Sequence, residues 1–180
     1  MIHHNIYKVP KFLEHKKNLI DLIYKIPINP LETKGEKISH QDFNLPKNVK
    51  RDYLNYFREN IFEGFAKNFC DFLTLDKIHV SELWFQVYEK GDFHEFHTHM
   101  KTNFTNVFYI NLPHKETKTQ FKLKNENFSI FVEEGDILSF PGYYPHSSPK
   151  NNYKDKKIII AFNMDCLYGK EYNELNIKRS

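Results

Sequence analysis

Three histidines of this chain have the types and positions needed to bind one metal ion. His97 and His99 are two residues apart in a segment whose neighbours are typical of β-strand. Side chains at positions i and i+2 of a strand leave the same face, so both imidazoles can reach one point. His146 comes later, at the end of an apolar segment that begins with Gly135-Asp136. Because neutral imidazole suits iron, zinc, copper and nickel, the pattern predicts a three-histidine metal site with open coordination positions.

The segments that must position these histidines change character along the chain. Apolar residues at helical spacing predict two helices, over residues 9–26 and 49–73. After residue 76 the spacing becomes that of strands. Short strands are predicted over residues 78–88, 95–99, 104–112, 119–123, 128–132, 137–140 and 158–164. The sequence therefore predicts a mainly β fold with some α, in which two N-terminal helices pack outside a barrel-like sheet.

Length and composition favour one folded domain over residues 1–180. A chain of 180 residues can bury a proper core, and 16% of its residues are aromatic. We expect residues 9–75 to be helical support, residues 78–165 to be the β core and residues 166–180 to be a charged peripheral tail.

Charge and cysteine content exclude several classes of protein. The net charge of +3 is too small to indicate nucleic-acid binding, and no apolar segment approaches the length of a membrane span. Cys70 and Cys166 have no metal-type spacing, and two reduced thiols are the expected state. We expect a cytoplasmic protein that binds neither nucleic acid nor membrane; the sequence gives no indication of oligomeric state.

Four blocks of sequence, in this order, resemble the iron(II)/2-oxoglutarate-dependent oxygenases. They are His97-x-His99, the segment 108–113 (Phe-Tyr-Ile-Asn-Leu-Pro), the segment 135–141 followed by His146, and the segment 157–163 (Lys-Ile-Ile-Ile-Ala-Phe-Asn). More narrowly, the chain is similar to the bacterial and phage oxygenases of this group that carry His-x-His. The resemblance implies a double-stranded β-helix, also called a jelly roll and shared with the cupins.

The same resemblance implies which residues bind the metal. His97, His99 and His146 would hold Fe(II), with O2 as oxidant and no catalytic residue beyond the metal ligands. His99 stands where most of the superfamily has a carboxylate, so the iron would carry one negative ligand less. Glu95 is the alternative carboxylate, although a solvent-exposed strand position is the simpler interpretation of it.

The resemblance also implies a site for the co-substrate 2-oxoglutarate. A cation on the last strand should pair with its distal carboxylate, and that position falls on Lys157, or on Lys156 if the register differs by one residue. Tyr88 and Tyr109 match positions from which tyrosine hydroxyls reach 2-oxoglutarate, and each could equally be an ordinary barrel aromatic. The implied reaction hydroxylates a C–H bond of a small-molecule or peptidyl substrate and releases succinate and CO2.

The sequence says less about the substrate and about the remaining histidines. Tyr143 and Tyr144 should lie at the rim of the iron site, and Asn163 shares a strand face with Lys157, so these three are candidate substrate contacts. His94 is expected on the opposite strand face from His97, exposed and not a ligand.

Two other functions remain open on the sequence alone. One is a three-histidine cupin-type iron dioxygenase that does not use 2-oxoglutarate, since Gly91 precedes His97 at cupin spacing. The other is a non-catalytic metal-binding barrel. A buried cation in the same cavity as the metal would favour the oxygenase, because a cupin has no need of one.

Overall fold

The computed structural model describes residues 2–167 of the chain. Most of the predicted charged tail, residues 168–180, lies outside the described residues. Residues 166 and 167 do not belong to a tail, because the last strand extends to Leu167.

The first part of the chain is mostly helical, with a few short strands. Its helices are α1 (Phe12–Ile23), α2 (Asp52–Phe57) and α3 (Glu63–Leu73), and a π-helical turn, Arg58–Phe62, joins α2 to α3. Its strands are β1 (Asn5–Lys8), β2 (Leu31–Glu32), β3 (Glu36–Ile38) and β4 (His40–Gln41).

The second part is made of strands. They are β5 (Lys77–Tyr88), β6 (Phe93–His97), β7 (Phe104–Asn111), β8 (Gln120–Leu123), β9 (Glu126–Ser129), β10 (Asp136–Pro141), β11 (His146–Ser148) and β12 (Lys157–Leu167), with a short 3-10 turn at Lys115–Thr117. All seven predicted strands are present with shifted ends. The sequence predicted neither β1 nor β11.

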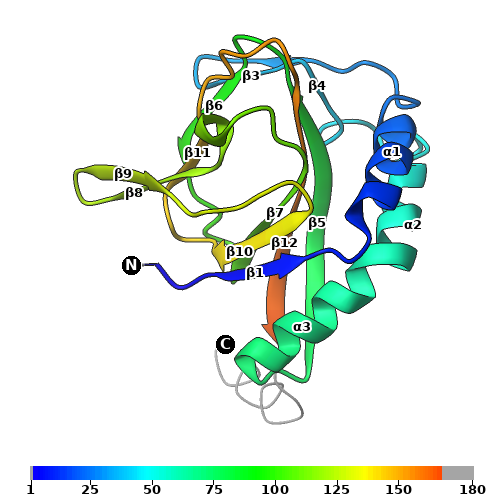
Figure 1. The fold of residues 1–180 in the computed structure, drawn as a ribbon, viewed down its shortest axis with the longest axis vertical. Helices are drawn as coiled ribbons and strands as arrows, with labels where there is room; N and C mark the ends of the chain where they lie inside the picture. The colour runs from blue at the N-terminus through cyan, green and yellow to red at the C-terminus, as the bar shows by residue number, and fades with distance from the viewer. Residues whose placement is uncertain (1, 168–180) are drawn as a thin grey trace, which may run out of the picture.

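The strands form two sheets of six (Figure 1). The large sheet has the order β1-β10-β7-β12-β5-β4, and the small sheet has the order β2-β3-β6-β11-β8-β9. Every pairing is antiparallel. The molecule is therefore mainly β, with two sheets and few helices.

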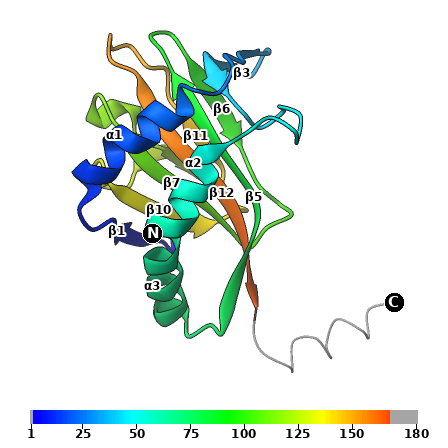
Figure 2. The same cartoon turned by 90° about the vertical axis from the view of Figure 1, so that its right-hand side faces the viewer.

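The three helices cover the outer face of the large sheet (Figure 2). Even-numbered residues of β12, such as Ile160 and Phe162, point into the core beneath the helices. Odd-numbered Ile159 belongs to a second core, which lies between the two sheets. Strand alternation thus places β12 in two cores at once.

The predicted helix over residues 49–73 is interrupted by the π turn, for a reason visible in its sequence. Buried Phe57, Ile61, Phe65 and Phe69 follow one another at intervals of four. In an α-helix of 3.6 residues per turn, each such interval rotates the side chain by about 40° away from the core. A turn of π-helix holds more residues and so corrects this drift.

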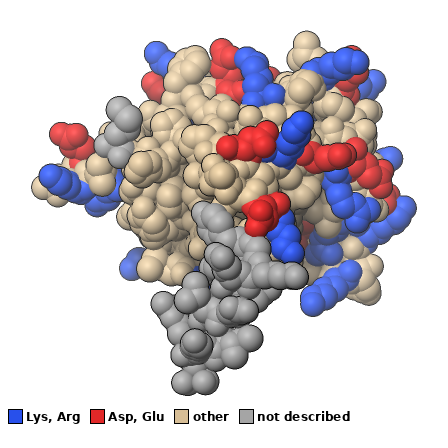
Figure 3. All heavy atoms as spheres, turned by 90° about the horizontal axis from the view of Figure 1, so that it is seen from below, with Lys and Arg blue, Asp and Glu red and all other residues tan. Residues whose placement is uncertain are grey.

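None of the described helices has the length and the apolar content needed to span a membrane. On the face seen in Figure 3, Lys and Arg side chains lie among Asp and Glu side chains.

Phe162 provides a test of the helix–sheet core. It is fully buried, and its ring lies 5.6 Å from Phe57 and 5.2 Å from Phe65, measured between centroids. Phe162→Ala should lower the free energy of unfolding by about 3–5 kcal/mol, because it removes a large side chain and leaves a cavity. The matched control is Phe131→Ala, which removes a ring that is 73% exposed and should change stability by about 1 kcal/mol or less. Urea denaturation measures both; equal effects would contradict this account of the core.

Candidate metal centre and cavity

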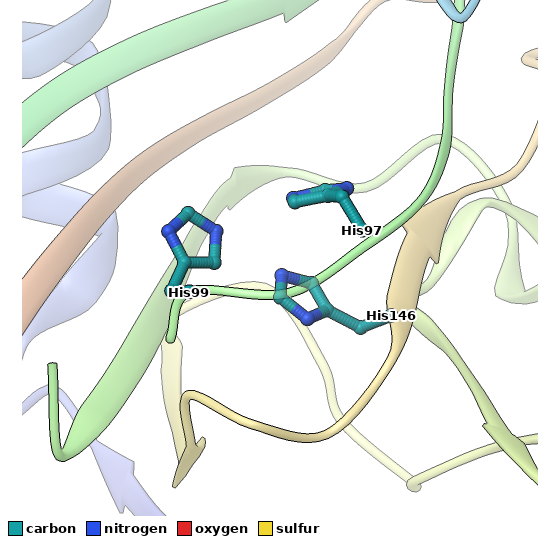
Figure 4. A group of neighbouring side chains, drawn as sticks. All are labelled: His97, His99 and His146. Carbon is teal, nitrogen blue, oxygen red and sulfur yellow. The ribbon is translucent and has the colours of Figure 1, made fainter. Parts of the chain in front are cut away.

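His97, His99 and His146 converge on one point between the sheets (Figure 4). Each offers a ligand atom, and these atoms all lie within 4.8 Å of one another. His97 is the last residue of β6 and His146 the first of β11, and the two are direct partners in the small sheet. Their ring centroids are 4.4 Å apart, and the ring of His99 lies 5.2 Å from that of His146.

Two of these rings are fixed by the backbone in the form that a metal needs. The Nδ1 atom of His97 is 2.8 Å from the carbonyl oxygen of Glu95, and that of His146 is 2.9 Å from the carbonyl oxygen of Tyr144. Since a carbonyl only accepts, each Nδ1 carries the proton and donates it. Each Nε2 atom is therefore left with a free lone pair, as is usual in metal-binding histidines.

Burial keeps all three imidazoles uncharged. It lowers the pKa of His97, lowers that of His99 to about 4 and lowers that of His146 well below its ordinary value. The neighbouring histidines add to the effect on His99 and His146. The neutral imidazole is the form that binds a metal, so the donor set fits a divalent ion such as Fe(II).

His99 lies beyond the end of β6 and is held by a close backbone contact with Gly142. The backbone N–H of His99 donates to the Gly142 carbonyl, at 2.8 Å. A Cβ atom on Gly142 would lie 2.5 Å from the His99 carbonyl oxygen, closer than any side chain allows. Glycine is therefore required here to bring the loop before His146 against His99.

The three histidines form part of the wall of a cavity of about 380 Å³ between the sheets. Lys157, Tyr88, Trp84 and Ala161 are also in that wall. On β12 and β5 the facing residues are partners, with Lys157 opposite Tyr88 and Asn163 opposite Glu82. The cavity therefore has a cationic end at Lys157 and, six residues along β12, an end beside His99.

The Lys157 ammonium group is buried in this wall. The residue is 1% exposed, its Nζ donates to Ser148 Oγ at 2.8 Å, and it lies 5.2 Å from the centre of the Tyr88 ring. Within residues 2–167 no carboxylate forms an ion pair with it. Desolvation alone lowers the pKa of Lys157 to about 7. Such a group favours an anion in the cavity, because an anion would restore its charge.

Lys156 points the other way. Its Nζ pairs with Glu89 Oε1 at 2.8 Å, and its side chain is 43% exposed. The alternation of β12 therefore places Lys157, and not Lys156, in the cavity.

The two tyrosines predicted for the co-substrate are placed differently. Tyr88 lines the cavity, and its hydroxyl donates to Gln86 Oε1 at 2.9 Å. Tyr109 is buried behind the wall, and its hydroxyl donates to Thr119 Oγ1 at 2.7 Å. Thr119 is in the wall, so Tyr109 reaches the cavity only through that threonine.

His94 is not where the sequence predicted. It lines the cavity, and its ring stacks on that of His97 with centroids 3.9 Å apart. The cause is a bulge in β6. His97 pairs with His146 and His94 with Ser148, so three steps on β6 oppose two on β11. The additional residue returns His94 to the same face as His97.

The remaining candidates also differ from one another in position. Glu95 is exposed, does not line the cavity and takes no part in the cluster of the three histidines. Tyr143 is 55% exposed, and Tyr144 packs against it, with ring centroids 4.6 Å apart; neither lines the cavity. Asn163 is buried beside the three histidines, with its Nδ2 atom 3.1 Å from His99 Nδ1.

Several cavity residues were not identified from the sequence. Glu82, Trp84 and Gln86 alternate with buried core residues on β5 and share a face with Tyr88. The period of two from Tyr88 was a sufficient signal for them. Ser148 and Thr119 carried no such signal.

Comparison with known proteins agrees with this arrangement at the level of the fold. No protein-family model matches the sequence, and no curated protein does so significantly. Among solved structures, an oxidoreductase of the 2OG-Fe(II) oxygenase family from Burkholderia pseudomallei is similar over 90% of this chain and 85% of its own, with 10% identity and a TM-score of 0.68. A Pseudomonas putida prolyl-4-hydroxylase is similar over 92% and 93%, with 13% identity and a TM-score of 0.56.

A third similar structure is HygX from Streptomyces hygroscopicus, solved with nickel, 2-oxoglutarate and hygromycin B bound. The similarity covers 91% of this chain and 83% of the HygX chain, with 8% identity and a TM-score of 0.62. At these identities the likeness concerns the fold. The chain has the fold of the 2OG-Fe(II) oxygenases, and the resemblance noted in its motifs is confirmed at that level.

The metal centre can be tested directly. His146→Ala removes a buried ligand from a site with three, so we expect it to lose stable Fe(II) or Co(II) binding, measured by calorimetric titration under argon. His114→Ala is the matched control, because His114 stacks on Tyr153, takes no part in the cluster and should leave metal affinity unchanged. Full metal occupancy in His146→Ala would disprove the assignment.

Proposed function

We propose that this protein is an Fe(II)- and 2-oxoglutarate-dependent oxygenase that hydroxylates a C–H bond of a small-molecule or peptidyl substrate. We further propose that its two sheets form a double-stranded β-helix and that residues 1–180 make one domain. The observation that carries the proposal is the buried, carboxylate-free ammonium of Lys157 in the same cavity as three converging histidines.

In this proposal the histidines, the lysine and the tyrosines of the site have defined tasks. The Nε2 atoms of His97, His99 and His146 hold Fe(II). Lys157 binds the distal carboxylate of 2-oxoglutarate, with the Ser148 hydroxyl and the Tyr88 ring beside it. Tyr109 contributes indirectly by orienting the Thr119 hydroxyl. Bound Fe(II) would supply the oxidising power, with O2 as oxidant and with conversion of 2-oxoglutarate to succinate and CO2.

The apolar part of the wall has a separate task. Ile159, Ala161 and Val107 leave room in the cavity and exclude water from the bound co-substrate. A low-dielectric wall strengthens the attraction between Lys157 and a carboxylate. Tyr143 and Tyr144, on the loop before His146, stay candidates for substrate contact.

A cupin-type dioxygenase that works without 2-oxoglutarate is less favoured by this cavity. Burying an ammonium group without a partner has a cost in stability, and such a protein gains nothing from it. The decisive experiment is incubation of the purified protein with Fe(II), O2 and 2-oxoglutarate, followed by quantification of succinate. Succinate formation above a His146→Ala control supports the proposal. Its absence with both small-molecule and peptidyl substrates supports the cupin-type dioxygenase.

The proposed function predicts a specific effect of removing the co-substrate cation. Lys157→Ala should weaken 2-oxoglutarate binding by about 2–5 kcal/mol, the usual cost of truncating one partner of a buried charge pair. Metal affinity should be largely unchanged, because Lys157 is not a ligand. Lys156→Ala is the matched control and should bind 2-oxoglutarate normally, since its ammonium group pairs with Glu89 outside the cavity. Unchanged affinity in Lys157→Ala would refute the co-substrate site.

The proposed function also predicts how the affinity for 2-oxoglutarate depends on pH. The pKa of Lys157 in the free protein is about 7, and only the cation pairs well with a carboxylate. A bound anion raises that pKa again, so binding above pH 7 must take up a proton. Affinity for 2-oxoglutarate should therefore fall by about tenfold between pH 6 and pH 8, as expected for one linked proton.

The groups around Lys157 do not blur this effect. Burial raises the pKa of Tyr88 on β5 and lowers that of His94 on β6 to about 3, so neither changes charge between pH 6 and pH 8. Glu36 on β3 faces His94, 3.3 Å from its Nε2 atom. Calorimetry in two buffers of different ionisation enthalpy measures the proton uptake. Affinity that stays flat or rises with pH in the wild type would count against the role of Lys157.

A further inference from the structure

The three histidines include no carboxylate, but the carboxylate of Glu82 is separated from His99 only by the side chain of Asn163. Glu82 on β5 and Asn163 on β12 are partners in the large sheet. Asn163 Nδ2 is 2.8 Å from Glu82 Oε2 and 3.1 Å from His99 Nδ1. A continuous series of polar contacts thus runs from a carboxylate to the metal ligand that replaces a carboxylate.

His99 differs from the other two ligands in what holds its Nδ1 atom. His97 and His146 use backbone carbonyls, which no substitution can remove. His99 relies on the side chain of Asn163, and its ring is stacked between Trp84 and His146, with centroid distances of 6.0 and 5.2 Å. Its orientation about the stacking axis therefore depends on Asn163.

The amide of Asn163 is itself fixed on its far side. Thr105 Oγ1 donates to Asn163 Oδ1 at 3.0 Å, and all these atoms except those of Glu82 belong to buried or half-buried residues. A histidine that binds metal through Nε2 carries its proton on Nδ1, so the amide oxygen would then face His99. The Thr105 hydroxyl allows this, because it can accept from the amide nitrogen as well as donate to the oxygen. In that orientation Glu82 no longer accepts a hydrogen bond from Asn163, so Glu82 acts on His99 through its charge alone.

Glu82 acts on the same ring through its charge. It lines the cavity at the His99 end, and within residues 2–167 it forms no ion pair with a lysine or arginine. The negative charge of Glu82 acts to raise the pKa of His99, against the larger lowering of that pKa by burial. A carboxylate behind a metal-bound imidazole makes that imidazole a stronger donor.

We propose that Asn163 and Glu82 are positioning residues for the metal centre. They orient His99 and lend it the negative charge that a carboxylate ligand would supply in most proteins of this fold. The proposal rests on the metal site of the proposed function and extends it beyond the three ligands. It also gives Asn163 a role toward the metal in place of the substrate contact expected from the sequence.

The test is metal affinity, which is independent of catalytic turnover. Titration with Co(II), with the visible absorption of the bound ion recorded, gives both affinity and geometry. Asn163→Leu keeps the size but removes the polar contact, and it should weaken Co(II) binding by about 10–100-fold and alter the spectrum. Asn163→Asp restores an acceptor facing His99 and should bind Co(II) at least as tightly as the wild type.

Glu82→Gln should weaken binding by about three- to tenfold, since its effect is indirect and near solvent. The matched control is Glu95→Gln, because the side chain of Glu95 is exposed and only its backbone contacts His97. If Asn163→Leu does not fold, Asn163→Asp and Glu82→Gln still decide the question.

The outcomes separate the two proposals. If the wild type binds no Co(II), the assignment of the metal centre itself is disproved. A wild type that binds Co(II), with Asn163→Leu or, where it does not fold, Glu82→Gln showing unchanged affinity and spectrum, would overturn the positioning role alone.

Discussion

The alternation of β12 is the constraint on which the rest of the structure depends. Its even-numbered residues are apolar and pack beneath the helices, while Lys157, Ile159, Ala161 and Asn163 face the space between the sheets. A shift by one residue would exchange these faces, placing an ammonium group among phenylalanines. The aromatic core around Phe162 therefore fixes the register that positions Lys157 and Asn163.

This register places a group in the cavity that does not stabilise the free protein. An ammonium group whose pKa falls to about 7 has lost much of its hydration, and within residues 2–167 only the Ser148 hydroxyl oxygen accepts a hydrogen bond from it. Proteins retain such groups where a ligand supplies the missing charge. The large apolar core on the other face of β12 offsets this cost, so binding and stability are divided between the two faces of one strand.

The parts of the molecule that depend on local periodicity could be predicted from the sequence. The strands of the β core and the direction of Lys157 follow from a period of two, and the convergence of the three histidines follows from motif order; His99 itself lies beyond the end of β6. The bulge in β6 could not be predicted, because it depends on pairing with β11, a three-residue strand that the sequence did not reveal. That bulge is why His94 enters the cavity. Likewise, Tyr109 has the same alternation as the cavity residues of its strand, but Thr119, the residue before β8, lies between its hydroxyl and the cavity.

Charge explains why a three-histidine centre and a buried lysine suit one another. An ion such as Fe(II), held only by neutral imidazoles, keeps its full double charge, whereas a carboxylate ligand would cancel part of it. Lys157 adds a further positive charge at the other end of the cavity when protonated. A dicarboxylate that spans the two ends would meet a cation at each of its own ends. In the proposed centre, Glu82 would limit this excess of positive charge from outside the ligand set, because its charge can act on His99 without occupying a coordination position.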